Sequence, residues 1–110
     1  MIIADYVNAM LNKDYKALSE CFSENCRLFD YCPPESIAEN YYIYGKWAVD
    51  MFYHNKFVLG GLSVLDPRIM DERTVNLYIN YGGSVNHAIA NIESYDPQTG
   101  LIKEMVIRPA

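Results

Sequence analysis

The sequence has few basic residues and no long hydrophobic run, and each shortage excludes a class of protein. Nine Lys and Arg stand against fourteen Asp and Glu, which gives a formal net charge of -5. This sign is wrong for a phosphate backbone, so we expect no nucleic acid partner. No apolar stretch is long enough to span a bilayer, and the start MIIADYVNAML lacks the features of a signal peptide. These absences predict a cytoplasmic protein that does not insert into membranes.

Cysteine and histidine are also scarce. The three cysteines, Cys21, Cys26 and Cys32, form no C-x-x-C pair, so neither a disulfide framework nor a zinc site is predicted. A thiol nucleophile would need a histidine partner, which His54 or His87 could supply. The alternative is that the thiols are buried and inert, as most free cysteines are. We expect no metal and no cofactor.

Periodicity predicts three helices in a chain whose 110 residues suffice for one core. The first helix ends near Asn12, and Asp14 is placed to cap a second, short one. The third is the stretch YGKWAVDMFYHNKF, residues 44–57, with Trp47 and Met51 on its predicted buried face together with Phe52 and Tyr44. Without a linker or repeat, residues 1–110 are predicted to be a single domain.

Strands are predicted around and after the third helix. A short strand is expected over Arg27 to Tyr31, before the break CPPES. From Phe57 onward the period changes to two, and Gly60-Gly61 suggests a bulge or a sharp bend in the first long strand. Gly82-Gly83 indicates a two-residue hairpin turn, and a last strand covers Leu101 to Arg108.

The hairpin turn also predicts a register. If Tyr81 pairs with Ser84, Tyr78 faces His87, and one face of the hairpin is polar. The other face is apolar and consists of Val75, Leu77, Ile79, Ala88, Ala90 and Ile92. If the next turn pairs Tyr95 with Leu101, Met105 lies beside Asn91 and Lys103 lies opposite Glu93.

The segments NKDYKALSECFSENCRLFD and YGKWAVDMFY, followed by long strands, resemble the nuclear transport factor 2-like superfamily, which includes the steroid delta-isomerases and the SnoaL-like polyketide cyclases. The resemblance covers nearly the whole chain. It implies an α+β fold, a cystatin-like cone in which three N-terminal helices pack on a curved antiparallel sheet. It also implies a pocket between the concave face of the sheet and the first helix.

The same resemblance implies catalytic residues. Tyr6 falls at the position of an oxyanion-hole tyrosine, Asp30 at that of the general base, and Asn91 at that of a second oxyanion donor, which is a protonated aspartic acid in the isomerases. In such a site a carboxylate moves a proton next to a carbonyl while neutral donors hold the enolate oxygen. The segment between Asp30 and Gly45 is longer than in the isomerases and would form a lid or an extra turn.

The predicted pocket lining favours a small polar ligand over a steroid. It consists of Trp47, Asn76, Tyr78, His87 and Met105 in addition to the catalytic residues. Each candidate also has a structural interpretation: Asp30 could end a strand at a turn, Tyr6 could be a packed aromatic, and His54 could be a solvated cap of the third helix.

Two functions remain open at this stage. The first is an isomerase, dehydratase or cyclase that acts on a small polar metabolite. The second is a non-catalytic ligand-binding or protein-interaction domain on the same fold. In either case an apolar sheet face left uncovered by the helices predicts a homodimer that packs through the outer face of the sheet.

Overall fold

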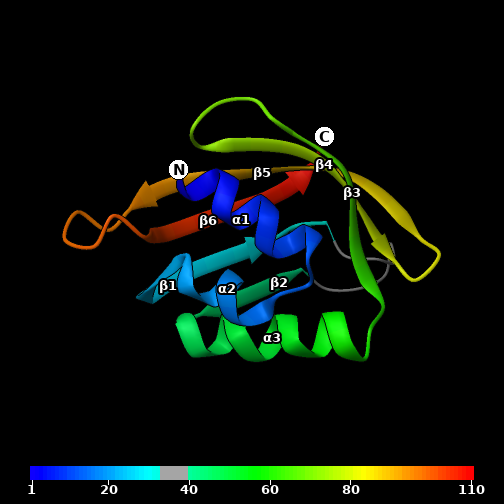
Figure 1. Cartoon of the computed structure of the whole chain (residues 1–110), viewed down its shortest axis with the longest axis horizontal. Helices are drawn as coiled ribbons and strands as arrows, with labels where there is room; N and C mark the ends of the chain where they lie inside the picture. Colours follow the sequence, from blue (N-terminus) through cyan, green and yellow to red (C-terminus); the bar gives the residue numbers. More distant parts are fainter. Residues whose placement is uncertain (33–39) are drawn as a thin grey trace.

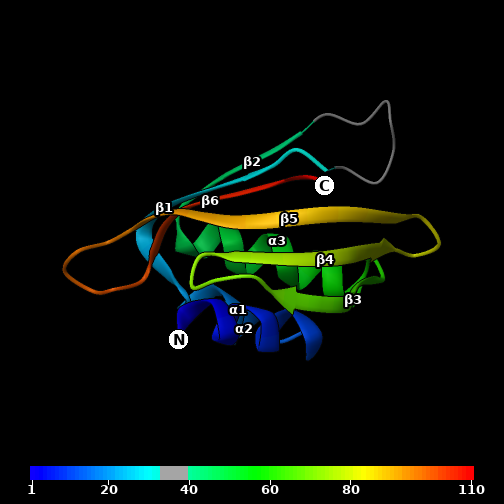
Figure 2. The same ribbon diagram turned by 90° about the horizontal axis from the view of Figure 1, so that it is seen from above.

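Helices and strands form two layers in the computed structural model, which describes residues 1–32 and 40–110 (Figures 1 and 2). The helices are α1 (Ile2–Leu11), α2 (Tyr15–Glu20) and α3 (Lys46–Val58). The strands are β1 (Phe22–Asp30), β2 (Tyr41–Tyr44), β3 (Leu62–Ile69), β4 (Thr74–Tyr81), β5 (Val85–Tyr95) and β6 (Ile102–Pro109). No helix of these ranges has the length and apolar character needed to cross a membrane.

The strands form one curved sheet in the order β2-β1-β6-β5-β4-β3, with the three helices on the same side of it (Figures 1 and 2). All neighbouring strands are antiparallel except β1 and β6, which are parallel. The α+β class is therefore confirmed. The expectation of three helices followed by an antiparallel sheet is wrong in part, because β1 and β2 precede α3 and the sheet is mixed. Residues 33–39 of the segment expected to form a lid or extra turn lie outside the described residues.

Short-range contacts explain where the helices begin. The Asp14 carboxylate accepts a hydrogen bond from the backbone N–H of Ala17 at 3.0 Å, which confirms its predicted role as the cap of α2. Gly45 precedes α3 with a φ of 95°, a conformation that side-chain-bearing residues rarely adopt. Tyr44, predicted to lie on the buried face of the third helix, instead ends β2 and is exposed.

The buried face of α3 differs from the predicted one. Trp47 and Met51 are 69% and 67% exposed, whereas Val49, Tyr53 and Phe57 are buried and Phe52 packs partly against the core. The helix carries two apolar stripes at a spacing of four residues, and spacing alone does not select between them. The stripe with three members is the one that the sheet covers.

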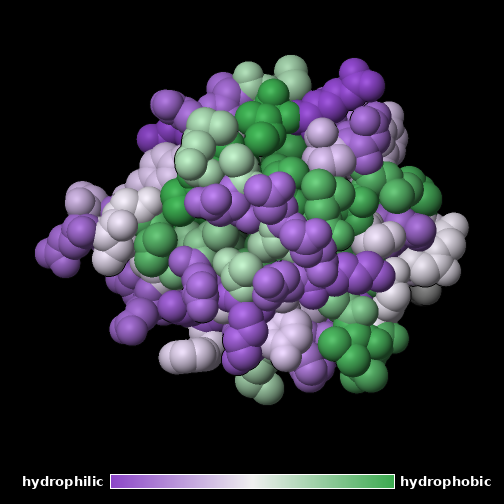
Figure 3. All heavy atoms as spheres, in the orientation of Figure 1, coloured by the Kyte–Doolittle hydropathy of each residue, from purple (hydrophilic) through white to green (hydrophobic). Residues whose placement is uncertain are grey.

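The end of α3 also corrects a strand prediction. The helix continues to Val58, and Gly61 follows it with a φ of 69°, so the two glycines lie at the end of a helix and not inside a strand, where a bulge or sharp bend was predicted. The bulge lies between Leu65 and Arg68 of β3, where Asp66 has a φ of 48°. Figure 3 shows hydrophobic surface over this end of α3, where Val58 and Leu59 are exposed.

The register of the β4–β5 hairpin is confirmed, but its faces are reversed. Tyr78 pairs with His87 as predicted, and the N–H of Tyr81 donates to the carbonyl of Ser84. The apolar face points inward, where α1 packs against β3 and β4, and each of its members is at most 2% exposed. The expectation that this face is uncovered and available for dimer formation is therefore wrong, because burial of apolar side chains against the helices decides which face is inner.

The β5–β6 register differs from the prediction by one residue. The N–H of Asp96 donates to the carbonyl of Leu101, so the turn closes one residue later than expected and Tyr95 pairs with Ile102. Consequently Met105 lies beside Ile92, and Glu93 forms its ion pair with Arg108, at 3.0 Å. The Asp96 carboxylate accepts from the N–H of Gln98, a local bond typical of Asp in turns.

Candidate functional site

Asp30 is the buried carboxylic acid of the sheet. It ends β1, pairs with Tyr41 of β2 on one side and Ile107 of β6 on the other, and is only 4% exposed. Its Oδ1 accepts a hydrogen bond from the N–H of Cys32 at 2.8 Å. Burial raises the pKa of Asp30 to about 6, while the Cys32 N–H and the charge of Lys56 act in the opposite direction. A carboxyl with this pKa accepts and releases a proton near neutral pH.

Tyr6 of α1 places a hydroxyl group near Asp30. The side chain is fully buried, and burial followed by the Asp30 charge raises the pKa of Tyr6, which keeps it a neutral donor. In the described part of the chain its hydroxyl is the buried side-chain polar atom that has no hydrogen-bond partner. An unsatisfied buried hydroxyl costs about 1–3 kcal/mol, so its presence needs an explanation beyond packing.

Two further tyrosines belong to the same group. Tyr53 of α3 and Tyr81 of β4 have raised pKa values, first because they are buried and also because of the charge of Asp30. The hydroxyl of Tyr81 donates to the carbonyl of Cys32 at 2.8 Å. Three elements, α1, α3 and β4, therefore each bring a protonated phenol within electrostatic reach of the carboxyl group that β1 carries.

A lysine completes the group. Lys56 of α3 donates from Nζ to the hydroxyl of Tyr41 at 3.1 Å, and the same ammonium lies 4.6 Å from the centroid of the Tyr41 ring. Tyr41 is the cross-strand partner of Asp30. The sequence did not predict Lys56, Tyr41, Tyr53 or Tyr81 as site residues.

The sequence contained a signal for two of these missed residues. Tyr81 continues the alternation of Leu77 and Ile79 on the inner face of β4, and Tyr53 lies four residues after Val49 and four before Phe57 on α3. Once the inner faces are known, both tyrosines follow from periodicity alone.

The predicted catalytic group is brought together only in part. Tyr6 and Asp30 lie close enough to interact electrostatically, whereas Asn91 lies on the outer face of the sheet and accepts a hydrogen bond from the Thr74 hydroxyl at 2.9 Å. Of the predicted ligand-binding residues, Trp47 is exposed on α3, away from the core, and Met105 is fully buried on the inner face.

The remaining predicted residues form a separate hollow on the outer face. Asn76, Tyr78 and His87 line a space of about 270 Å³ together with Asp66 and Arg68. The rings of Tyr78 and His87 stack with centroids 4.4 Å apart, and His87 Nε2 is hydrogen-bonded to Asn76 Oδ1. The register thus brings these three side chains together as predicted, but on the side of the sheet opposite Asp30.

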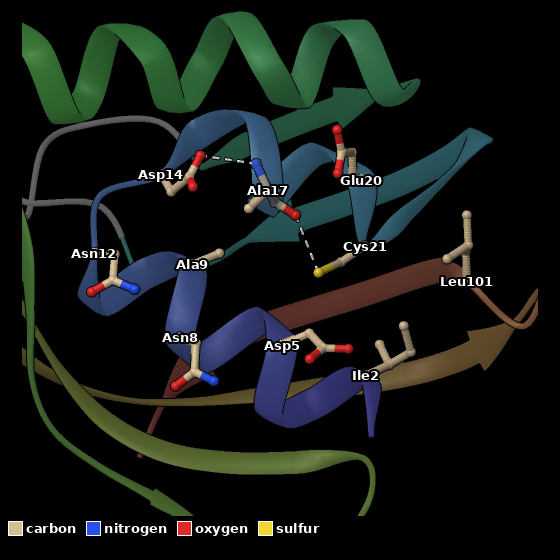
Figure 4. Close-up of a pocket in the computed structure, with 10 residues that line it drawn as sticks. All are labelled: Ile2, Asp5, Asn8, Ala9, Asn12, Asp14, Ala17, Glu20, Cys21 and Leu101. Carbon is tan, nitrogen blue, oxygen red and sulfur yellow. Dashed lines mark hydrogen bonds between the residues drawn. The ribbon is translucent and has the colours of Figure 1, made fainter.

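A larger groove of about 450 Å³ lies between α1 and α2 (Figure 4). It presents the carboxylates of Asp5 and Glu20, and Cys21 at its wall donates its thiol hydrogen to the carbonyl of Ala17. Burial, followed by these two carboxylates, raises the pKa of Cys21 to about 11, so this thiol is not a nucleophile at neutral pH. Among the described residues no group of three His, Cys, Asp or Glu side chains could hold a metal ion.

All three cysteines are free and buried, as the alternative to a thiol nucleophile predicted. His54, the other candidate partner for a thiol, is exposed in the penultimate turn of α3 and packs edge-on against the ring of Tyr15, with the ring centroids 4.7 Å apart.

Comparison with known proteins identifies the fold. No protein-family model and no curated protein matches the chain. A cystatin-like protein of unknown function from Methylobium petroleophilum covers 99% of this chain and 73% of its own, with a TM-score of 0.70 and 15% identity. An NTF2-like protein of unknown function from Cytophaga hutchinsonii covers 99% and 87%, with a TM-score of 0.67 and 12% identity.

A third solved structure, from Sinorhizobium meliloti, is provisionally named a polyketide cyclase. It covers 97% of this chain and 93% of its own, with a TM-score of 0.69 and 18% identity. At these identities the likeness establishes the fold and leaves the chemistry to the residues of this chain. The curved six-stranded sheet that holds three helices on one side is the fold of the NTF2-like proteins.

Proposed function

We propose that the chain is a small enzyme that moves a proton at the carbon next to a carbonyl group, as an isomerase, dehydratase or cyclase does. One observation carries the proposal: on the inner side of the sheet the buried carboxyl group of Asp30 interacts electrostatically with the buried hydroxyl of Tyr6, which has no hydrogen-bond partner among the described residues. The NTF2-like fold is consistent with it, because the resemblance to the steroid isomerases gives the same two positions these roles.

The chemistry follows from the protonation states. At neutral pH the Asp30 carboxylate takes a proton from the carbon, and the electron pair of the broken C–H bond forms the C=C bond of an enolate. The negative charge moves to the former carbonyl oxygen, where the Tyr6 hydroxyl donates a hydrogen bond. Protonated Asp30 then returns the proton to the same or another carbon. The raised pKa values of Tyr6 and Tyr53 keep both phenols protonated through this cycle.

The test is exchange of hydrogen for deuterium in small carbonyl compounds. The protein is incubated in D₂O with 4-oxopentanoate and with its methyl ester, and loss of the C–H signals next to the ketone is followed by proton NMR. A positioned base accelerates such a step by about 10² to 10⁴. Asp30→Asn should abolish the acceleration, and Asp66→Asn, at an exposed aspartate, should leave it unchanged. Binding without exchange would instead support the non-catalytic ligand-binding alternative.

We also propose that two copies of the chain assemble through the outer face of the sheet. The proposed surface differs from the apolar hairpin face of β4 and β5, which the helices cover. The aromatic rings of Phe29, Tyr31, Tyr42 and Tyr44 contact one another there, and Tyr42 and Tyr44 are 54% and 62% exposed. The same face carries the ion pairs Arg27–Glu104 and Arg108–Glu93, so a copy related by a two-fold axis can oppose unlike charges.

Light scattering at tens of micromolar tests this assembly. The expected result is a dimer mass for the natural chain and a monomer mass for the Tyr42→Lys, Tyr44→Lys double variant. A monomer mass for the natural chain would overturn the proposal.

A further inference from the structure

Lys56 occupies an unusual position for a helix-surface lysine. It lies in the last turns of α3 and is half-buried. Its ammonium lies 4.6 Å from the ring centroid of Tyr41 on β2 and 5.4 Å from that of Phe52, one turn earlier on α3. The hydrogen bond that it donates goes to the neutral hydroxyl of Tyr41. Within residues 1–32 and 40–110 no carboxylate lies within 4 Å of this ammonium, so its positive charge is not cancelled by a described ion pair.

This ammonium is a near neighbour of the proposed base. Tyr41 pairs directly with Asp30 across β1 and β2, so the ring that Lys56 covers projects from the same side of the sheet as the Asp30 carboxyl. The charge of Lys56 also lowers the pKa of Asp30, against the larger effect of burial. The base, the Tyr6 hydroxyl and one cation thus belong to a single group of side chains.

From this arrangement we infer that the compound on which Asp30 acts carries a carboxylate, and that the ammonium of Lys56 and the hydroxyl of Tyr41 bind it. The inference rests on the proposed function and names its substrate class, a small oxo acid. The ketone oxygen lies at Tyr6, the C–H bond at Asp30 and the carboxylate at Lys56. Lys56 and Tyr41 are then binding residues, and neither exchanges a proton with carbon.

The arrangement also couples binding to basicity. A carboxylate bound at Lys56 offsets the positive charge that lowers the pKa of Asp30 and adds a negative charge of its own. Both effects raise the pKa of Asp30 and make it a stronger base when the substrate is present. A neutral compound of the same shape has no such effect.

The experiment compares two probes that differ in one charge, 4-oxopentanoate and its methyl ester, in NMR titrations of the natural chain and three variants. Lys56→Gln removes the ammonium, and Lys56→Arg keeps the charge. Lys46→Gln is the matched control, because Lys46 lies at the other end of α3 with its ammonium 5.9 Å from the ring centroid of Trp47. It loses the same charge and the same kind of ring contact.

The natural chain and Lys46→Gln should bind the acid about ten-fold more tightly than the ester, which is about 1.4 kcal/mol. Lys56→Gln should bind both probes equally, and Lys56→Arg should recover most of the preference. The pKa of Asp30, followed by carbon NMR of its carboxyl group, should rise when 4-oxopentanoate binds and stay constant with the ester. It should also rise in Lys56→Gln without a probe.

The outcomes separate this inference from the proposed function. A preference for the acid that disappears in Lys56→Gln, without deuterium exchange, supports the carboxylate site and counts against proton transfer. Deuterium exchange that is equal for acid and ester and unchanged in Lys56→Gln supports proton transfer and overturns the carboxylate site. Equal affinity for both probes in the natural chain, or binding of neither, also overturns it.

Discussion

Replacing Asp30 with Asn should change how the stability of the fold depends on pH. The pKa of Asp30 is raised from 3.8 to about 6 because the carboxyl is buried. Between these two pH values the folded protein binds more protons than the unfolded chain, so stability falls as the pH rises through this window. Above about pH 7, where folded Asp30 is ionised, the cost of the buried charge is fully present and constant. The amide of the variant has no proton to lose, so the variant should show no such fall.

The size of the effect follows from the same pKa values. A difference of about two in pKa corresponds to about 3 kcal/mol at roughly 1.36 kcal/mol for each unit. This shift already includes the hydrogen bond from the N–H of Cys32 to Asp30 Oδ1, which favours the charged carboxylate and lowers the pKa. The variant should therefore be about 3 kcal/mol more stable at pH 8, or about 12 °C in melting temperature.

The assay is urea unfolding of the natural chain and Asp30→Asn at intervals from pH 3.5 to pH 8, followed by tyrosine fluorescence and circular dichroism. The difference between the two curves isolates Asp30, because the other titrating groups are common to both. Asp66→Asn, which alters an exposed ion pair with Arg68, should stay within about 1 kcal/mol of the natural chain at each pH. A variant less stable than the natural chain at pH 8 would refute the reasoning and favour the interpretation of Asp30 as a turn residue.

Three further substitutions test the fold and the site. Leu77→Ala should cost about 2–5 kcal/mol of unfolding free energy, and Leu65→Ala on the outer face less than about 1 kcal/mol, because only Leu77 is buried; equal losses in urea unfolding would contradict the assigned faces. Tyr6→Phe should leave stability unchanged or raise it by about 1 kcal/mol in urea unfolding, since it removes an unpartnered hydroxyl; a large loss would indicate an internal partner. Gly83→Ala should lower the melting temperature by several degrees, about 1 kcal/mol, because Gly83 has a φ of 127° although the space around it is open; an unchanged melting curve would mean that the turn relaxes.

Local turn chemistry explains which parts of the sheet could be predicted. Gly82-Gly83 fixes the β4–β5 register without knowledge of the rest of the fold, and each predicted pair of that hairpin is present. The sequence predicts the β5–β6 turn one residue too early, because either Tyr95 or Asp96 could be the last paired residue before it. In the structure the hydrogen bond from the N–H of Asp96 to the carbonyl of Leu101 shows that it is Asp96. A shift of one residue moves a side chain to the other face, so this small difference separates Met105 from Asn91.

A site residue could be predicted where its own segment determined its position. It could not be predicted where the position depended on which face of the sheet is the inner one. Tyr6 lies on the buried stripe of α1 and Asp30 at the end of β1, and the resemblance assigned both. The side of the sheet that faces the helices depends on the packing of the whole chain, and that choice placed Asn91 outside and Ala90 inside. Lys56 gave no signal in the sequence, because a lysine near the end of a helix is ordinarily a solvated cation.

The parallel pairing of β1 with β6 has a consequence for how the chain reaches its folded state. Arg27 lies beside Glu104, and Asp30 beside Ile107, so the strand that carries the proposed base obtains its central neighbour from the other end of the sequence. Such a contact closes a long loop and is slow to form. We therefore expect the Asp30 carboxyl to keep the ordinary acidity of a solvated aspartate until β6 pairs with β1, and to acquire its raised pKa in that late step of folding.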